Sequence, residues 1–201
     1  MAQKNENKIL KFLESKKNRS RLYTVLFFVI FGVFFIVNNS GNEPEKGPYP
    51  PNYVPGQNNA AVKEIAPNFS LNSIEGEKIS LADYKGKIVL VDFWATWCGP
   101  CRKGVPDLVD LKNKYSDKGF EVIGISVDRS NTISQVKPFA KEFNINYPVV
   151  YTDEQTPGKF GGIQYIPTSF VIDQEGYIVS KHVGYVEKEQ YIKEIEELLK
   201  K

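Results

Sequence analysis

Few side chains in this 201-residue sequence can bind a metal or cross-link a fold, since it holds two cysteines, one histidine and one methionine. A structural zinc site takes four ligands, mostly cysteine and histidine. Cys98, Cys101 and His182 would together leave such a site one ligand short. We therefore expect no metal ion and no other cofactor in this protein.

Excess positive charge is missing from most of the chain. Residues 1–21 hold seven of the 26 Lys and Arg residues against two acidic ones, so the remainder carries 19 basic and 22 acidic residues. A protein that binds nucleic acid usually presents a basic surface. Because the body of the chain has no such excess, we predict no nucleic-acid partner.

One uncharged run follows the basic N-terminus: "LYTVLFFVIFGVFFIV", residues 22–37. As a helix it would be roughly 24 Å long, a little less than a ~30 Å hydrocarbon core. Tyr23 and the long stems of Arg19 and Arg21 can make up the difference at the interface. The positive-inside rule then predicts a cytoplasmic tail over 1–21 and a single transmembrane anchor over 22–37.

Two other interpretations of residues 22–37 stay open. A cleaved signal peptide has an apolar stretch only slightly shorter than this one, and it would also place the body outside the cytoplasm. A buried core helix is the second, although the run is apolar on every face. No A-x-A-like cleavage site follows the run, which favours an uncleaved anchor. The predicted location is the cell membrane, with the body in the periplasm or at the outer face.

A tether separates this run from the folded part of the chain. Residues 38–61, "NNSGNEPEKGPYPPNYVPGQNNAA", contain five prolines and can bury little apolar surface. We therefore predict a linker over 38–61 and one folded domain over 62–201.

Hydrophobic periodicity predicts an α/β sandwich with a mixed central sheet for the folded domain. "FSLNSIEGEKISL" is typical of a β-hairpin that turns at Glu75-Gly76. One helix is expected to follow Cys98 and to end just before Gly119, and others are expected over 131–143 and at the C-terminus. Further strands are expected over 87–95, 120–128, 147–152, 168–173 and 177–183.

The stretch "VDFWATWCGPC", residues 91–101, contains both cysteines. As a structural staple the pair would be weak, because closing a four-residue loop contributes only about 2 kcal/mol. Half of a zinc site and a pair of inert buried thiols are two further interpretations. Positions i and i+3 share a helix face, so two sulfurs there can bond and separate with little backbone motion. The spacing therefore favours dithiol–disulfide exchange.

Cys98 falls at the expected strand-to-helix junction, where free N–H groups and the helix dipole favour a thiolate. The dipole alone contributes about 0.3–1 kcal/mol, which is less than the ~1.36 kcal/mol of one pKa unit. A hydrogen bond from the Cys101 thiol and the nearby charges of Arg102 and Lys103 would have to add to it. Pro100 suits the first helical turn, where no N–H is needed.

The same stretch resembles the active site of thioredoxins. "IQYIPTSFVID", with Ile166-Pro167-Thr168, resembles the cis-proline loop of that family, and "HVGYV" follows it. The segment "APNFSLNSIEGEKISLADYKGK" and the extra helix over 131–143 are similar to the membrane-anchored TlpA/ResA-like branch. Together these stretches cover most of residues 65–200. The resemblance implies a thioredoxin-like sandwich with an N-terminal β-hairpin and one inserted helix.

The resemblance also implies roles for individual residues. Cys98 is the attacking thiolate, Cys101 is the resolving thiol, and Asp92 is a buried acid that moves the proton of Cys101. Burial should raise the pKa of Asp92, although an aspartate at a bulge or facing water is the alternative. The implied substrate-binding residues are Trp97, Gly99, Pro100, Ile166, Pro167, Thr168 and Gly184, with a core aromatic as the alternative for Trp97.

Two positions depart from the patterns of these relatives. Gly124 stands where cytoplasmic thioredoxins often have a lysine near the acid. Gly104 stands where TlpA/ResA-like proteins usually have a glutamate. His182, which no motif includes, is expected to be a solvated strand residue.

These features predict a membrane-tethered extracytoplasmic thiol–disulfide oxidoreductase that reduces disulfides of exported proteins, apocytochrome c among them. The resemblance further implies a membrane electron donor that relays electrons from cytoplasmic thioredoxin. A peroxiredoxin-like peroxidase is one alternative, but those enzymes have a threonine and a proline where this chain has Ala95 and Val91. A tethered module that binds clients in a groove of Trp97, Ile166 and Pro167 is another.

Overall fold

The computed structural model describes residues 27, 28, 30, 31 and 64–200. The predicted tail and linker, and most of the predicted anchor, lie outside these residues. Phe27, Phe28, Ile30 and Phe31 are helical and exposed. Within the described residues, no helix combines the length and apolar character that a membrane crossing requires.

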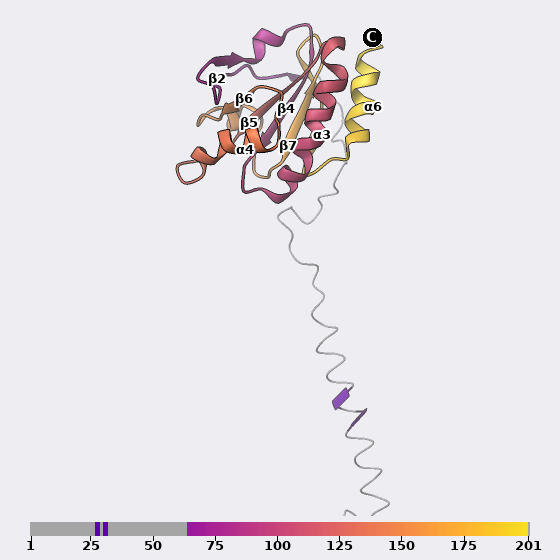
Figure 1. Cartoon of the computed structure of the whole chain (residues 1–201). Helices are drawn as coiled ribbons and strands as arrows, with labels where there is room; N and C mark the ends of the chain where they lie inside the picture. Colours follow the sequence, from indigo (N-terminus) through magenta and orange to yellow (C-terminus); the bar gives the residue numbers. More distant parts are fainter. Residues whose placement is uncertain (1–26, 29, 32–63, 201) are drawn as a thin grey trace, which may run out of the picture. The chain divides into compact units, whose positions relative to one another are not determined.

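A mixed sheet runs through residues 64–200, and Figure 1 shows its strands β4 and β7 beside α3. Its strands are β1 (Glu64–Ile65), β4 (Ile88–Trp94), β5 (Phe120–Ser126), β6 (Val149–Tyr151), β7 (Thr168–Ile172) and β8 (Tyr177–Val183). They lie in the order β1–β8–β7–β4–β5–β6. β5 is parallel to β4 and β6, whereas β7 is antiparallel to β4 and β8. The predicted α/β sandwich with a mixed sheet is confirmed.

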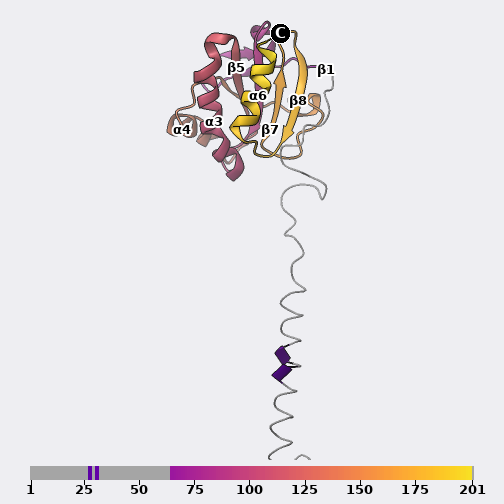
Figure 2. The same ribbon diagram turned by 90° about the vertical axis from the view of Figure 1, so that its right-hand side faces the viewer.

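Two long helices, α3 (Gly99–Tyr115) and α6 (Lys188–Leu198), cover one face of the sheet, as Figure 2 shows. Side chains alternate along a strand, so Leu90, Asp92 and Trp94 of β4 belong to the α3 and α6 side. Val91 and Phe93 belong to the apolar cluster on the other side. Asp92 is therefore a carboxylate placed among apolar residues under two helices.

The hairpin at the start of the domain is confirmed as a separate two-stranded sheet. β2 (Ser70–Asn72) pairs antiparallel with β3 (Lys78–Ser80). Phe69 and Leu71 are buried against the face of the main sheet opposite α3. A 3₁₀ turn over Leu81–Tyr84 then leads into β4.

The inserted helix is shorter than predicted. Instead of a helix over 131–143, a 3₁₀ turn over Ile133–Gln135 precedes α4 (Val136–Glu142). Pro138 explains the late start, because inside a longer helix its ring would clash with the carbonyl of residue 134. In the observed helix it lies in the first turn, where no N–H is required. Ile133 is consequently exposed and not part of a buried helix face.

Two short elements were not expected from the sequence. They are β1, which pairs antiparallel with β8, and α5 (Thr156–Lys159). A two-residue strand and a four-residue helix are too short to produce a hydrophobic period. A further 3₁₀ turn, Ser116–Lys118, ends at Gly119, which has the left-handed φ of 84° that closes the turn.

Candidate active site

The two cysteines lie where β4 passes into α3. Cys98 is the N-cap of α3 and Cys101 is in its first turn, and the two form a disulfide with Cα atoms 5.2 Å apart. Cys98 and Cys101 are 5% and 2% exposed. The strand-to-helix junction predicted for Cys98 is thus present, and the structure shows the oxidised state of the pair.

The main chain supplies a donor to Cys98. The N–H of Cys101 points to Cys98 Sγ at 3.2 Å, and no acidic residue occupies the first turn of α3. Pro100 stands in that turn without leaving an N–H unpaired. When the pair is reduced, the same N–H and the helix dipole stabilise a Cys98 thiolate.

The basic residues after Cys101 have partners of their own. The Arg102 guanidinium lies 4.9 Å from the ring centres of Phe139 and Phe143, and it donates to the carbonyl of Thr96 at 3.2 Å. Glu142 lies 3.8 Å from the same guanidinium. Arg102 therefore ties α4 to the loop that precedes Cys98, in addition to any effect of its charge on the sulfur.

Lys103 is directed to a different neighbour. Its Nζ lies 3.7 Å from the centre of the Tyr185 ring and 3.6 Å from the carboxylate of Glu187. The Tyr185 ring also passes over Gly104, where an added Cβ would lie 3.6 Å from ring carbon Cδ2. The place next to Gly104 is therefore occupied by a tyrosine from the segment that precedes α6.

Asp92 is 5% exposed, and burial raises the pKa of this carboxyl to about 7. It lies in an unbroken register, opposite Gly124 of β5 on one side and Ser169 of β7 on the other. The alternative of a bulge or a solvent-facing aspartate is therefore wrong. An acid with this pKa can exchange a proton near neutral pH.

Lack of space for a side chain explains why the residue opposite Asp92 on β5, Gly124, is a glycine. A Cβ at Gly124 would lie 2.9 Å from Trp94 Nε1 and 3.2 Å from Tyr147 Cε2. Trp94 is fully buried, and its Nε1 has no hydrogen-bond partner within residues 64–200. Two aromatic rings thus fill the volume that a lysine at position 124 would need, and burial is the cause of the raised pKa of Asp92.

A small cavity joins Asp92 to the disulfide. It has a volume of about 20 Å³, and its walls include Asp92, Cys101, Pro167, Gly184 and Tyr191. A cavity needs roughly 10–15 Å³ to hold one water molecule. The space between the carboxyl and the resolving sulfur is therefore large enough for one water that relays a proton.

The proline loop closes over the disulfide from the other side. The Ile166–Pro167 peptide bond is cis, and the carbonyl oxygen of Ile166 lies 3.6 Å from Cys98 Sγ. The N–H of Gly184 donates to the carbonyl of Pro167 at 2.7 Å, which fixes the loop to the end of β8. Ile166, Pro167 and Gly184 are thus brought to the redox pair.

The remaining predicted substrate residues differ in exposure. Trp97 is 62% exposed, and Gly99 and Pro100 are exposed too. Trp97 is therefore not a core aromatic. Thr168 is 2% exposed, and its hydroxyl donates to the carbonyl of Tyr165 at 2.7 Å. Its side chain faces the interior and braces the proline loop, so the structure does not bring it to a substrate surface.

His182 is not the solvated residue expected from the sequence. It is 1% exposed, and its Nε2 lies 3.1 Å from Glu194 of α6. Its ring meets that of Tyr191 edge to face at 5.4 Å, and the Tyr191 hydroxyl lies 2.7 Å from Ser169 Oγ. A row of polar residues thus continues from Asp92 through Ser169 to His182 beneath α6.

A carboxylate beneath the Cys98 loop was also missed. Asp128 is 3% exposed and accepts hydrogen bonds from the Thr96 N–H at 2.9 Å and the Thr96 hydroxyl at 2.7 Å. It lies two residues after the end of β5, and its bonds to Thr96 join the loops that follow the parallel strands β4 and β5. Within the part of the chain that the structure describes, no group of three His, Cys, Asp or Glu side chains is arranged to hold a metal ion.

Comparisons with known proteins agree with this geometry. The model of the AhpC/TSA family matches residues 62–181. Thiol-disulfide oxidoreductase ResA of Bacillus thuringiensis subsp. konkukian is 33% identical over 186 residues, which cover 92% of this chain and 98% of that protein. Thioredoxin-like protein YneN of Bacillus subtilis is 37% identical over 125 residues, covering 62% of this chain and 73% of the relative.

Solved structures give the same result. A thiol:disulfide interchange protein of the thioredoxin family from Chlorobium tepidum superposes with a TM-score of 0.64 at 36% identity. The match covers 69% of this chain and 98% of the other. The fold around the cysteine pair is therefore thioredoxin-like, as the resemblance implied.

Proposed function

This chain belongs to the AhpC/TSA family and is a thiol–disulfide oxidoreductase of thioredoxin-like type, and from that premise we propose that it reduces disulfides of exported proteins while tethered to the outer side of the cell membrane. One observation carries the proposal. The Cys98–Cys101 disulfide caps α3, and its resolving sulfur shares a small cavity with the buried acid Asp92.

The first step uses Cys98. In the reduced protein its thiolate attacks one sulfur of a client disulfide, forms a mixed disulfide and releases the other client sulfur as a thiolate. The Cys101 N–H and the dipole of α3 stabilise Cys98 as the anion. The cis-proline loop holds the attacked segment of the client beside the sulfur.

The second step uses Cys101 and Asp92. The carboxylate of Asp92 accepts the Cys101 proton, directly or through one water in the cavity, and the Cys101 thiolate attacks Cys98 Sγ. The client leaves with its second sulfur reduced, and the Cys98–Cys101 disulfide of this structure is formed. Two electrons pass to the client, and the proton on Asp92 goes to the departing thiolate or to solvent. A pKa of about 7 suits both halves of this exchange.

The tether and the electron source are supported by the sequence. The basic residues 1–21 and the uncharged run 22–37 favour an anchor with the catalytic domain outside. An oxidising compartment leaves the pair as a disulfide, so a reductase there needs a donor. The resemblance to TlpA/ResA-like proteins supports a membrane donor that takes electrons from cytoplasmic thioredoxin, and apocytochrome c as one client.

Reduction of insulin tests the enzymatic part of the proposal. The full-length chain, purified in detergent and supplied with dithiothreitol, should accelerate insulin precipitation, and Cys98→Ser should abolish the effect. Absence of acceleration, or full activity of the Cys98→Ser variant, would contradict the proposal. Protease added to intact cells with a permeable outer layer should digest the domain and spare the N-terminal tail.

The family match also makes a peroxidase worth testing. Ala95 is fully buried and has no hydroxyl group. The hydroxyl of Thr96 donates its hydrogen bond to Asp128, so neither residue provides a free hydroxyl at Cys98. We therefore expect slower consumption of hydrogen peroxide than of protein disulfides, and the reverse order would favour the peroxidase. Client binding that survives replacement of both cysteines by serine would instead favour a binding module.

A further inference from the structure

A cleft with no assigned role lies beside the redox disulfide. It has a volume of about 450 Å³ and is lined by Trp97, Val127, Arg129, Ser130, Asn131 and Thr132. It shares none of these residues with the cavity of Asp92 and Cys101. One of its walls is the residue that directly precedes Cys98, so a client bound to the sulfur passes close to it.

Hydrogen bonds join the two segments that line the cleft, which are the loop after β5 and the loop before Cys98. Asp128 accepts from the N–H and hydroxyl of Thr96 and from the Ser126 hydroxyl at 3.0 Å, and the Val127 N–H donates to the Trp94 carbonyl at 2.8 Å. These bonds fix the loop after β5 to the loop before Cys98. Both oxygens of Asp128 accept these bonds, and its carboxylate is 3% exposed and does not line the cleft.

Arg129 brings a positive charge to this cleft. Its carbonyl accepts from the N–H groups of Thr132 and Ile133 at 2.7 and 2.9 Å, so its backbone is held in place. Its guanidinium is exposed and has no hydrogen-bond or ion-pair partner within residues 64–200. Arg102 and Lys103, in contrast, are both engaged by rings and carboxylates.

Trp97 brings an exposed ring to the same cleft. It is 62% exposed, whereas Trp94 of the same motif is fully buried. Large aromatic side chains and arginine are the residues that most often dominate the binding energy of an interface. The guanidinium fork also matches the geometry of a carboxylate.

We propose that this cleft selects client segments with an acidic side chain close to the reactive cysteine. The client carboxylate pairs with Arg129, and the neighbouring client residues pack on Trp97. The proposal rests on the proposed function, because it concerns clients that Cys98 attacks. The cleft thus adds a charge preference to client binding, which otherwise depends on contact between an extended client backbone and the cis-proline loop.

Two synthetic peptides test the preference. Each contains one intramolecular disulfide, and they differ only in Glu or Lys beside one cysteine. The full-length chain in detergent is reduced, freed of reductant and mixed with each peptide, and tryptophan fluorescence gives the second-order rate constant of a single turnover. The wild type should reduce the Glu peptide about two- to five-fold faster than the Lys peptide at low salt, as expected for one exposed ion pair.

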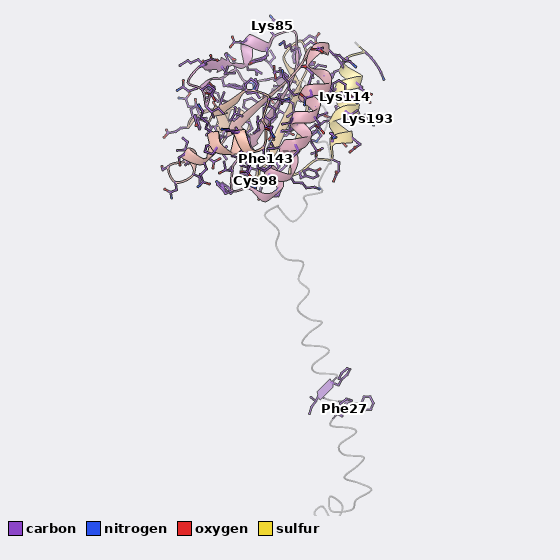
Figure 3. All side chains as sticks on the ribbon, viewed as in Figure 1. Phe27, Lys85, Cys98, Lys114, Phe143 and Lys193 are labelled. Atoms are coloured by element: carbon purple, nitrogen blue, oxygen red, sulfur yellow. A yellow bond between two sulfur atoms is a disulfide. The ribbon has the colours of Figure 1, made fainter. Side chains whose placement is uncertain are left out.

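Arg129→Glu and Lys85→Glu form a matched pair of variants. Both change the net charge equally, and Figure 3 shows Lys85 and Cys98 at opposite ends of the folded domain. Arg129→Glu should reverse the preference, so that the Lys peptide reacts faster, whereas Lys85→Glu should keep that of the wild type. Salt should diminish the preference in every protein, since it screens exposed charges.

Three results separate this proposal from the function on which it rests. Equal rates for both peptides with the wild type would overturn the proposed charge preference of the cleft and would leave the proposed reductase function standing. An equal shift in Arg129→Glu and Lys85→Glu would also overturn it, because net charge would then be the cause. Failure of the wild type to reduce either peptide would overturn the proposed function.

Discussion

Replacing Asp92 by asparagine should stabilise the oxidised protein at neutral pH while it slows the resolving step. The side chain lies under α3 and α6, and burial raises the pKa of Asp92 from an ordinary 3.8 to about 7. An asparagine has nearly the same shape and no charge to desolvate. The variant therefore removes the cost of ionising the acid and also removes the group that accepts the Cys101 proton.

The magnitude follows from the difference between the two pKa values. A rise of about three units, at ~1.36 kcal/mol each, corresponds to roughly 4 kcal/mol. The folded protein binds this proton more tightly than the unfolded chain does, so the wild type loses stability as pH rises from about 4 to about 7. The Asp92→Asn variant has no such loss, and its stability relative to the wild type should rise by roughly 4 kcal/mol over that interval.

Denaturation at several pH values measures this difference. A fragment that begins at Asn52, where the second compact unit of the chain starts, would be unfolded with guanidinium at pH 4 to 8 without reductant. Other titrating groups are the same in both proteins and largely cancel. In parallel, the rate of mixed-disulfide resolution should rise with pH around 7 in the wild type and lose that rise in Asp92→Asn.

A difference in unfolding free energy that stays flat from pH 4 to 8 would refute the reasoning, because Asp92 would then titrate alike in the folded and unfolded states. A resolution rate with the same pH profile in both proteins would separately remove Asp92 from the proton transfer. The two readouts are independent, since the first concerns burial and the second concerns Cys101.

Three further changes have expected outcomes. Cys101→Ser should accumulate mixed disulfides with clients that non-reducing gels and mass spectrometry detect, and Cys98→Ser should yield none, because only the first sulfur attacks. Gly124→Ala should lower the unfolding free energy by about 1–3 kcal/mol, since its Cβ would lie 2.9 Å from Trp94 Nε1; Gly99→Ala, which has open space, is the control, and equal midpoints would contradict this. Burial opposes ionisation of Glu194, yet hydrogen bonds with His182 and other neighbours hold its pKa below the ordinary value. The stability advantage of the wild type over Glu194→Gln should therefore be full near neutral pH and disappear as acid protonates Glu194, and denaturation at pH 3 and 7 would measure it.

The positions of the redox residues could be predicted because they depend on neighbours in the chain. The apolar run that became β4 leads directly to Cys98, and Pro100 marks the first turn of α3. An apolar run, an N-terminal helix signal and a three-residue spacing are local patterns. They place the sulfurs at the end of β4, whereas the role of Asp92 came from the resemblance to thioredoxins.

The surroundings of Asp92 could not be predicted in the same way. Tyr147 and Tyr191 come from segments about 50 and 100 residues further along the chain, and no local period relates them to β4. The spacing of Ser180 and His182 did contain a signal, because alternate residues of a strand share a face. The partner of that face, Glu194 on α6, appears only when the helix is docked.

The inserted helix shows a different kind of error. The apolar spacing over 131–143 is genuine, but Pro138 decides where an α-helix can begin. Covalent geometry at one residue thus overrode a pattern spread over thirteen. The stack of Phe139, Phe143 and Arg102 that results is the contact by which the insertion reaches the loop before Cys98.

The sulfur of Cys98 caps α3, and this has a consequence for the energetics of electron transfer. The Cys101 N–H meets a neutral sulfur in the oxidised protein and an anion after reduction, and a charge-assisted hydrogen bond is about twice as strong as a neutral one. Whatever stabilises the reduced form makes the disulfide easier to reduce and the dithiol a weaker reductant. The cap that activates the nucleophile therefore also limits which client disulfides this protein can open.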